Sequence, residues 1–508
     1  METKIVVTKK NEAYVKIACE RSVAQELSEF FTFFVPGHQF TPAFRNRIWD
    51  GKIRLFDLRT FELYHGLVMY IESFAKERDY IVEYGNPRPD LLDDYPEYHA
   101  DKFISMINPQ SRGKNIDVRD YQKAAYIHAI RNQRAVLLSP TSSGKSLIIY
   151  LIICQLLDYQ NLKGLIVVPT TSLVEQLYSD FEDYSSENSF DVSEKLHRVY
   201  QGKDKVSDKA VIISTWQSIY TQPPEYFEQF DFVIGDEAHL FKAQSLAKIM
   251  SQCINAKYRI GLTGTLDGTK THKLVLEGLF GQVMKVITTK ELMDAGQVAD
   301  FSIKCLVLKH NDEICKLMKG KTYQEEMEYL ILNEERNKFI KNLAVSLKGN
   351  SLILYQYVDK HGKILYDMIS NTSNIGNRKV FFVYGKTDTD VREDVRRITE
   401  QENDAIIVAS YGTFSTGINI RNLHNVIFAS PSKSRVRNLQ SIGRGLRLGD
   451  NKTEATLYDI ADDLRWKNHM NFTLKHFVER TKIYNDEKFT YKLYKIGLKN
   501  GSSTATKT

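Results

Sequence analysis

Cysteine and long apolar runs are scarce in this chain of 508 residues. Its five cysteines form no C-x-x-C pair and lie beside no histidine cluster, which argues against a zinc site and a disulfide framework. They are Cys19, Cys154, Cys253, Cys305 and Cys315. The longest mainly apolar run, residues 147–157, is shorter than the ~20 residues of a membrane span. Residues 1–10 lack the apolar core of a signal peptide. We therefore expect a protein of the reducing cytoplasm with no membrane partner.

The composition is that of a globular protein with several cores. Hydrophobic residues make up 42% and charged residues 26% of the chain, and its length indicates roughly three to four domains. The net charge of +6, with 28 Tyr and 26 Phe, is compatible with a polyanionic partner but is weak evidence alone.

Residues 135–146, AVLLSPTSSGKS, form the central motif. A short apolar strand, a loop of small residues, Gly-Lys-Ser and an apolar helix are the context of a phosphate-binding loop. The helix start attracts anions, Lys145 would neutralise the β- and γ-phosphates, and Ser146 would ligate Mg²⁺. The loop comprises Ser139, Pro140, Thr141, Ser142, Ser143 and Gly144. Ser139 stands where the pattern requires Gly, so a polar turn that merely contains Gly-Lys-Ser is the alternative.

An acidic pair follows the apolar strand predicted at residues 232–234. Asp236 there can hold Mg²⁺ through its water shell, and Glu237 can orient and deprotonate an attacking water. The alternative is an acidic turn after a strand. Upstream, the side-chain amide of Gln122 can read adenine as donor and acceptor, although this signal is weak alone.

Strands alternating with helices predict two parallel sheets. In the first domain the strands are expected at residues 135–138, 164–168, 210–213, 232–234 and 259–262. In the second they are expected at 352–354, 380–383, 405–408, 426–428 and 456–458, after a mainly helical stretch at 313–347. Residues 440–447, QSIGRGLR, place Arg444 and Arg447 on one helix face, where they could stabilise charge on a γ-phosphate.

The N-terminal region predicts a small α+β domain. A strand pair is expected at residues 5–7 and 14–18, and a helix at 22–34 with Ser22 as its N-cap. Asp50-Gly51 predicts a hairpin turn within an alternation of basic and aromatic residues suited to nucleic acid. Its cations are Arg45, Arg47, Lys52 and Arg54. The alternative is that these aromatics are core and these charges solvated.

The C-terminal region again mixes bases and rings. Residues 462–497 predict a helix packed on the second domain, and whether they also contact a nucleic-acid strand stays open. The expected division is 1–112 (N-terminal), 113–285 and 286–460 (the two sheet domains), 461–500 (helical extension) and 501–508 (disordered tail).

Seven motifs occur in a diagnostic order: Gln122, the phosphate loop, PTTSLVEQ, DEAH, TGT, TFSTGINI and QSIGRGLR. Over residues 115–450 this order resembles the superfamily 2 helicases and translocases of the DExH kind, and the whole chain is similar to the recombination helicases of T-even bacteriophages. The resemblance implies two RecA-like domains and an ATP- and Mg²⁺-dependent DNA helicase. It further implies branched substrates such as forks, D-loops, R-loops and Holliday junctions. The expected partners are branched, single-stranded and duplex DNA, with RNA in R-loops, and the protein is expected to be a monomer in the host cytoplasm.

The resemblance also implies roles for individual residues. Arg119 or Tyr121 would assist Gln122 at adenine, and Thr263 and Thr265 would couple the nucleotide site to the strand. Gly417, Arg444 and Arg447 would complete the site from the second domain, and Thr170, Thr215 and Thr413 would contact backbone phosphates. Asn419 stands where many relatives have Asp, so a ribose contact there is weakened.

Three other functions remain to be compared with a helicase. They are a duplex translocase that does not separate strands, an RNA helicase, and a non-catalytic nucleic-acid-binding protein. The intact Lys145, Asp236, Glu237, Arg444 and Arg447 argue against the last of these. The sequence contains no nuclease motif outside the motor.

Overall fold

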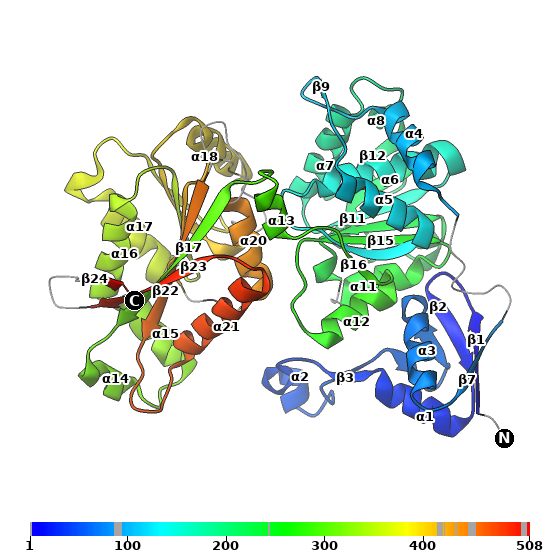
Figure 1. The fold of residues 1–508 in the computed structure, drawn as a ribbon, viewed down its shortest axis with the longest axis horizontal. Coiled ribbons are helices and arrows are strands. Elements are labelled where there is room, and N and C mark those ends of the chain that lie inside the picture. The colour runs from blue at the N-terminus through cyan, green and yellow to red at the C-terminus, as the bar shows by residue number, and fades with distance from the viewer. Residues whose placement is uncertain are drawn as a thin grey trace. The chain divides into compact units, whose positions relative to one another are not determined.

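The computed structural model divides the chain into two compact units (Figure 1). One unit comprises residues 1–139 and 143–287, and the other comprises 140–142 and 288–508. The structure describes residues 3–85, 94–241, 244–413, 420, 422–430, 432, 434–445, 454–498 and 505–507. Each unit is considered by itself below.

The first unit begins with a five-stranded sheet of order β5-β6-β2-β1-β7. Its strands are β1 (Lys4–Lys9), β2 (Tyr14–Ala18), β5 (Phe56–Asp57), β6 (Glu62–Tyr64) and β7 (Ile81–Tyr84). Alternate residues of β1, Ile5 and Val7, are buried against the helices α1 (Arg21–Phe30) and α3 (Val68–Lys76). The antiparallel pairing of β1 with β2 confirms the predicted strand pair.

Two local predictions in this region are wrong. Helix α1 has Glu20 at its N-cap position rather than Ser22, and it ends at Phe30 because the next residues enter a strand. Asp50 and Gly51 form no two-residue hairpin. Strand β3 (Thr32–Phe34) pairs with β4 (Lys52–Arg54), so the connection spans residues 35–51. It contains a short 3-10 turn, His38–Phe40, and the helix α2 (Pro42–Arg45).

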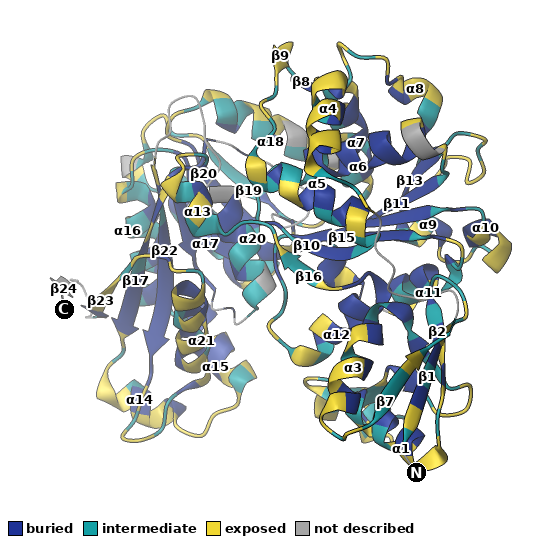
Figure 2. Cartoon of the chain, turned by 45° about the vertical axis from the view of Figure 1, so that its right-hand side comes forward, coloured by how far each residue is buried: buried dark blue, intermediate teal, exposed yellow. Residues whose placement is uncertain are grey.

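The rest of the first unit is a parallel sheet of seven strands in the order β12-β13-β11-β14-β15-β10-β16. The strands are β10 (Arg134–Leu138), β11 (Gly164–Val168), β12 (Leu196–Val199), β13 (Val211–Thr215), β14 (Phe232–Asp236), β15 (Tyr258–Thr263) and β16 (Val283–Lys285). One face packs on α4 (Glu97–Ile107), α5 (Asp120–Asn132), α6 (Lys145–Gln160) and α7 (Thr171–Tyr184). The inner strands are buried on both faces, which is why they appear in the sequence as apolar runs (Figure 2).

The other face of this sheet shares its core with the N-terminal domain. Helices α11 (Gln244–Gln252) and α12 (Lys270–Leu279) and the N-terminal sheet and helices belong to one continuous apolar cluster. Gly66 approaches so closely that a Cβ there would lie 1.9 Å from the carbonyl oxygen of Glu277 in α12. The Tyr70 hydroxyl donates to the Glu277 carboxylate at 2.6 Å. The N-terminal domain is therefore built onto the sheet domain.

Two arginines, Arg134 and the fully buried Arg259, reinforce this junction. Arg134, the first residue of β10, donates to the backbone oxygen of Glu12 at 2.5 Å and to its carboxylate at 2.7 Å. Burial and the neighbouring Arg259 lower the pKa of Arg134 to about 9, while Glu12 opposes that shift. Arg259 donates to three backbone carbonyls, those of Met250, Cys253 and Leu279. Both arginines thus lie at the amino ends of adjacent strands.

The second unit contains a sheet of order β19-β20-β18-β21-β22-β17-β23-β24. Its strands are β17 (Asp300–Lys309), β18 (Ser351–Tyr355), β19 (Val380–Val383), β20 (Ile406–Ser410), β21 (Asn425–Phe428), β22 (Glu454–Asp463), β23 (Tyr491–Gly497) and β24 (Ala505–Lys507). All pairs are parallel except β23 with β24. The five predicted strands of this unit are confirmed.

Helices of the second unit also follow the sequence closely. The predicted helical stretch contains α14 (Asp312–Met318), α15 (Tyr323–Leu332) and α16 (Glu334–Ser346). Near the C-terminus, α21 (Phe472–Asp486) packs on β22. After α21 in the chain, β23 joins the sheet by pairing with β17. Residues 501–508, where disorder is predicted, include the short strand β24. No helix in the described part of the chain is both long and apolar enough to cross a membrane.

A buried ion pair fastens α21 to the sheet. The Arg480 guanidinium lies 2.9 and 3.0 Å from the two carboxylate oxygens of Asp459 and donates to the Ser432 carbonyl at 3.1 Å. Asp459 also accepts from the Tyr484 hydroxyl at 2.8 Å, and it raises the pKa of Arg480 against the effect of burial. Both partners are fully buried.

We expect the Arg480–Asp459 ion pair to be needed for the stability of the second unit. Arg480→Met leaves Asp459 buried without its cation, so it should lower the free energy of unfolding by about 3–5 kcal/mol. Faster amide hydrogen exchange in β22 and α21, measured by mass spectrometry, checks this. The control on the same helix is Lys482→Met, which removes an exposed pair with Glu479 and should change stability by less than about 0.5 kcal/mol. Equal exchange in both variants contradicts the prediction.

Candidate functional site

The phosphate loop joins β10 to α6. Residues 139–144 connect them, and two of these residues have left-handed backbones, Ser142 with φ 70° and Gly144 with φ 80°. A Cβ at Gly144 would lie 2.2 Å from Nε2 of Gln122, so the close approach requires glycine as well. The strand–loop–helix context that the motif requires is therefore present.

Ser139, the departure from the glycine pattern, is built into the loop. Its hydroxyl oxygen lies 2.6 Å from that of Ser143, and both side chains are buried. Its backbone N–H donates to the carbonyl of Thr263 at 2.8 Å, joining the loop to the TGT segment. The serine thus adds a hydrogen bond that a glycine lacks.

Side chains at the start of α5 form hydrogen bonds to the phosphate loop. Gln122 accepts from the backbone N–H of Arg119 at 3.0 Å and donates to the carbonyl of Ser143 at 2.9 Å. The Tyr121 hydroxyl donates to the same carbonyl at 3.1 Å and accepts from the Arg119 guanidinium at 2.8 Å. A side-chain amide can make two donor and two acceptor bonds, so these contacts are compatible with adenine recognition, which stays a prediction.

Lys145 and Ser146 begin α6. The Lys145 ammonium donates to the carbonyl of Ser139 at 3.3 Å, across the loop that it would use to hold phosphates. The Ser146 hydroxyl lies 2.8 Å from the hydroxyl of Tyr184, at the end of α7. Burial raises the pKa of Tyr184, which keeps it neutral beside Ser146. Sequence reasoning assigned nothing to Tyr184, since no motif marks it.

The acidic pair lies where β14 ends. Asp236 is buried and accepts from the backbone N–H of Glu237 at 2.9 Å. Burial and the Glu237 carboxylate raise the pKa of Asp236 to about 6, against the opposing charge of Lys145. Glu237 has a left-handed backbone with φ 52°.

These groups fit a divalent cation. The Glu237 carboxylate raises the pKa of Asp236, and a cation beside Asp236 would remove that penalty. The described residues contain no cluster of three or more His, Cys, Asp or Glu side chains suited to a metal. One hydroxyl and one carboxylate, completed by phosphate and water, are typical of Mg²⁺ with a nucleotide.

A hydrogen-bonded chain connects the acidic pair to the TGT segment. The Glu237 carboxylate lies 3.3 Å from Nδ1 of His239, which lies 3.0 Å from the hydroxyl of Thr263. That hydroxyl donates to the carbonyl of Thr265 at 3.0 Å. Sequence reasoning quoted His239 within DEAH without giving it a role, although its spacing from Glu237 was a usable signal.

The three predicted phosphate-contacting threonines lie at or just after strand ends. Thr170 caps α7 after β11, and Thr215 is the last residue of β13, the neighbour of β11. The Thr215 hydroxyl lies 2.8 Å from that of Ser218. In the second unit, Thr413 follows β20 with its hydroxyl 2.7 Å from that of Ser410. The structure thus brings Thr170 and Thr215 to adjacent strand ends of one sheet.

The predicted cations of the N-terminal domain lie in or beside the β3–β4 connection. Arg45, Arg47 and Arg54 are exposed, and Lys52 lies 4.9 Å from the ring centroid of Phe34. Arg54 forms an exposed ion pair with Asp50 at 2.5 Å.

The second unit holds the remaining predicted residues. Arg444 lies in helix α20 (Arg435–Gly445), while Gly417, Asn419 and Arg447 lie outside the described residues. Arg435 of α20 forms ion pairs at 2.7 Å with Asp486 and Glu487, at the end of α21. The C-terminal helix thus fixes the helix that carries Arg444.

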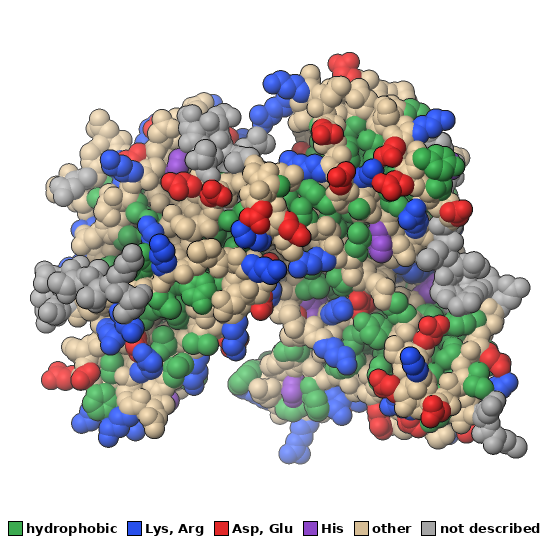
Figure 3. All heavy atoms as spheres, in the orientation of Figure 1, with side chains coloured by type: hydrophobic (Ala, Val, Ile, Leu, Met, Phe, Trp, Pro, Cys, Tyr) green, Lys and Arg blue, Asp and Glu red, His purple; other side chains and the backbone are tan. Residues whose placement is uncertain are grey.

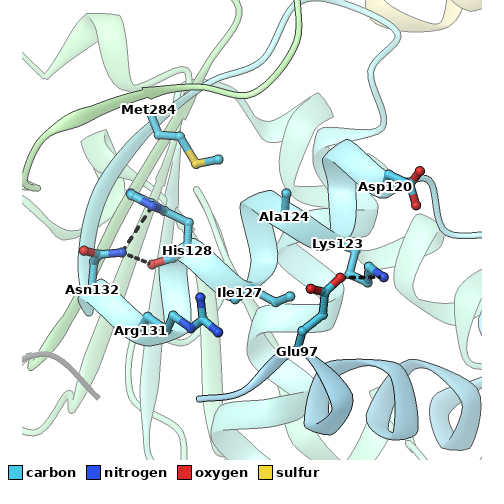
Figure 4. A pocket seen from close by; sticks show the side chains of 9 residues that line it. All are labelled: Glu97, Asp120, Lys123, Ala124, Ile127, His128, Arg131, Asn132 and Met284. Carbon is cyan, nitrogen blue, oxygen red and sulfur yellow. Dashed lines mark hydrogen bonds and ion pairs between the residues drawn. The ribbon is translucent and has the colours of Figure 1, made fainter. Parts of the chain in front are cut away.

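A separate cavity of about 460 Å³ lies along α5, between α4 and β16 (Figure 4). No residue predicted for the nucleotide site lines it. Two of its charged groups form an ion pair: the Lys123 ammonium lies 3.1 Å from the carboxylate of Glu97. Asn132 donates to the carbonyl of His128 at 2.8 Å. We assign no function to this cavity.

Three protein-family models match consecutive parts of the chain. Residues 4–84 match "DNA helicase UvsW, N-terminal", residues 115–268 match "type III restriction enzyme, res subunit", and residues 334–449 match "helicase conserved C-terminal domain". These matches confirm the two predicted sheet domains as RecA-like helicase domains.

Individual relatives match about three quarters of the chain or more. The ATP-dependent DNA helicase uvsW of Enterobacteria phage T4 is 37% identical over 500 residues, covering 96% of this chain and 98% of that protein. The DNA 3'-5' translocase XPB2 of Sulfurisphaera tokodaii is 26% identical over 74% of this chain and 89% of its own length.

Solved structures agree with these matches. The crystal structure of T4 UvsW superposes with a TM-score of 0.52 at 35% identity, covering 98% of this chain and all of that one. The type ISP restriction-modification enzyme LlaBIII bound to DNA superposes with a TM-score of 0.55 at 15% identity, covering 83% of this chain and 34% of its own, which shows a shared fold.

The Ser139–Ser143 hydrogen bond predicts an effect on nucleotide affinity. Ser139→Gly removes that bond and frees the backbone, so ATP affinity should fall by about two- to tenfold. Ser139→Ala removes the bond alone and should have a smaller effect. Equilibrium titration with a fluorescent ATP analogue checks both variants. Unchanged or tighter binding by the glycine variant would show that the serine does not stabilise the loop.

Proposed function

This chain belongs to the UvsW family of superfamily 2 ATP-dependent DNA helicases, and on that premise we propose that it remodels branched DNA. Forks, D-loops, R-loops and Holliday junctions in recombination, repair and replication are the proposed substrates. The enzyme is proposed to act as a monomer in the cytoplasm of a host cell. The observation that carries the proposal is the identity to UvsW along nearly the whole chain, N-terminal domain included.

The chemistry follows from the residues at the strand ends. Lys145 neutralises the β- and γ-phosphates of ATP that lie in the loop. Ser146 and Asp236 would hold Mg²⁺, which when bound would neutralise charge on the phosphates. Glu237, positioned through His239 and Thr263, orients the attacking water and accepts its proton.

The second domain supplies further cations to the triphosphate. Arg444 and Arg447 stabilise the charge that develops on the γ-phosphate in the transition state. Gly417 allows close approach, and Asn419 offers its amide to the ribose. The ion pairs between α20 and α21 support this role, because they hold the helix that bears Arg444 in place.

DNA contacts are proposed to reach phosphates rather than bases. Hydroxyl groups at or near strand ends can donate hydrogen bonds to phosphate oxygens; they belong to Thr170, Thr215 and Thr413. The exposed Arg45, Arg47 and Arg54 and the half-buried Lys52 add electrostatic attraction. Binding is therefore expected to be insensitive to sequence and to weaken with salt.

A duplex translocase that moves without separating strands is the second candidate. The similarity to XPB2, a protein named as a translocase, favours it. ATPase stimulation by single-stranded, duplex, forked and four-way DNA, with RNA for comparison, tests the substrate class. A strand-displacement assay beside it separates helicase from translocase. Stimulation by RNA alone would overturn the proposal.

The assigned base predicts a clear separation of binding from turnover. Glu237→Gln keeps the shape of the side chain but cannot accept a proton, so ATP should bind within about threefold of the wild-type affinity. Turnover should fall by about 100-fold or more. Nucleotide titration and a phosphate-release assay measure the two quantities. Hydrolysis near the wild-type rate would remove Glu237 from its assigned role.

The basic residues predict the salt dependence of DNA binding. Replacing Arg45, Arg47, Lys52 and Arg54 together by Gln should weaken branched-DNA binding and reduce the slope of log Kd against log salt by up to about 4. ATP hydrolysis without DNA should persist. Gel-shift titration at several salt concentrations measures affinity and slope.

A matched control removes the same number of cations elsewhere. Each is an exposed lysine that forms an ion pair with a carboxylate in the second unit: Lys290, Lys321, Lys338 and Lys360. Replacing these four by Gln should leave the affinity for branched DNA within about threefold of the wild-type value. Equal losses in both variants would indicate a general effect of charge and refute a specific basic surface.

A further inference from the structure

The connection between β3 and β4 exposes large apolar side chains. We call residues 34–54 the arm; it contains Phe34, Phe40 and Ile48, with 56%, 69% and 79% of their surface exposed. Ile48 is the most exposed large apolar side chain among the described residues. Such a concentration on one short segment indicates contact with a partner.

The arm is ordered by a small cluster of its own. The His38 ring stacks on Phe34 at a centroid distance of 4.9 Å and meets Phe44 edge-on at 4.7 Å. Gly51 lies against it so closely that a Cβ there would be 2.4 Å from the His38 ring. The Trp49 indole donates to the Lys52 carbonyl at 2.9 Å. Phe40 and Ile48 form no part of this cluster, so their exposure is not needed to fold the arm.

The charge of the arm selects the kind of partner. Its charged residues are four cations, Arg45, Arg47, Lys52 and Arg54, and a single acid, Asp50. Basic and apolar side chains gather on the projecting α2 segment at the lower centre of Figure 3. Phosphates attract cations, while apolar side chains stack on exposed bases or wedge between base pairs. A polyanion with accessible base faces fits both features.

The residues that directly precede the arm contact helix α12 of the first RecA-like domain. The Lys270 ammonium, at the start of α12, lies 5.9 and 5.5 Å from the ring centroids of Phe30 and Phe33. Two residues on, His272 of α12 lies 2.9 Å from the carbonyl oxygen of His239 in DEAH. One helix thus contacts both the acidic motif and the root of the arm.

We propose that Phe40 and Ile48 form an apolar tip that stacks against the last base pair at a DNA branch and separates its strands. This inference rests on the proposed action on branched DNA. It adds a division of labour within the arm: the cations hold phosphates and provide affinity, whereas the tip opens the base pair at the branch.

The test removes the tip and leaves the cations. Phe40→Ala with Ile48→Ala changes two exposed side chains, so folding should be preserved. At saturating enzyme, strands displaced from a forked duplex per ATP hydrolysed should fall by about tenfold. The matched control, Val206→Ala with Leu317→Ala, shortens two side chains that are exposed to a similar degree elsewhere and should retain the wild-type ratio.

A second measurement reports the opened base pair directly. With 2-aminopurine at the branch and a non-hydrolysable ATP analogue, the wild type should increase fluorescence and the double variant should not. Phe40→Tyr, which keeps a ring, should retain the increase.

The outcomes are distinguishable. Wild-type enzyme that displaces no strand refutes the proposed helicase activity itself. A double variant with the wild-type displacement ratio and fluorescence change refutes the tip alone. Loss of self-association in the double variant, seen by sedimentation, with displacement unchanged would assign the tip to a protein interface and overturn the inference.

Discussion

Parallel pairing of strands is the constraint on which the rest of this molecule depends. In a parallel sheet every strand delivers its carboxyl end to the same edge, so the chain can bring distant motifs together there. The strand order places the predicted nucleotide motifs and the predicted DNA contacts on separate groups of strands along that edge. Neighbouring β14, β15 and β10 lead to DEAH, TGT and the phosphate loop, while neighbouring β13 and β11 lead to Thr215 and Thr170. ATP chemistry and the proposed strand contacts therefore lie side by side, because of the order in which strands are hydrogen-bonded.

The opposite edge of the same sheet has a different function. Arg134 is the first residue of β10 and Arg259 the second residue of β15, and both strands end beside the predicted nucleotide groups. Arg134 is bonded to Glu12 of the N-terminal domain. Each of these strands therefore links a structural anchor at one end to a chemical group at the other. The hydrogen-bonded chain through Glu237, His239 and Thr263 extends this continuity across the nucleotide edge.

Much of the architecture could be predicted because buried parallel strands leave apolar runs in the sequence. Strand β18 is fully buried and was found from its sequence, whereas β23 was missed because Ile496 is its only buried residue. Asp50-Gly51 suggested a local hairpin, but pairing of β3 with β4 across 17 intervening residues (35–51) decided the fold. Motif order predicted the nucleotide groups. It gave no role to His239 and no sign of Tyr184, whose positions result from contacts between distant segments.

The N-terminal domain and the RecA-like sheet share one apolar core, so the N-terminal domain cannot be removed without exposing that core. Ile5, Leu27 and Phe74 belong to the same apolar cluster as Val136 and Val233 of the RecA-like sheet. A shortened chain that lacks the N-terminal domain would expose this face of the sheet to water. Such an exposed apolar surface favours aggregation. Exchange of N-terminal modules between such enzymes would have to preserve a buried surface, and not merely a linker. Substitutions of exposed side chains of the N-terminal domain, by contrast, would leave this common interior intact.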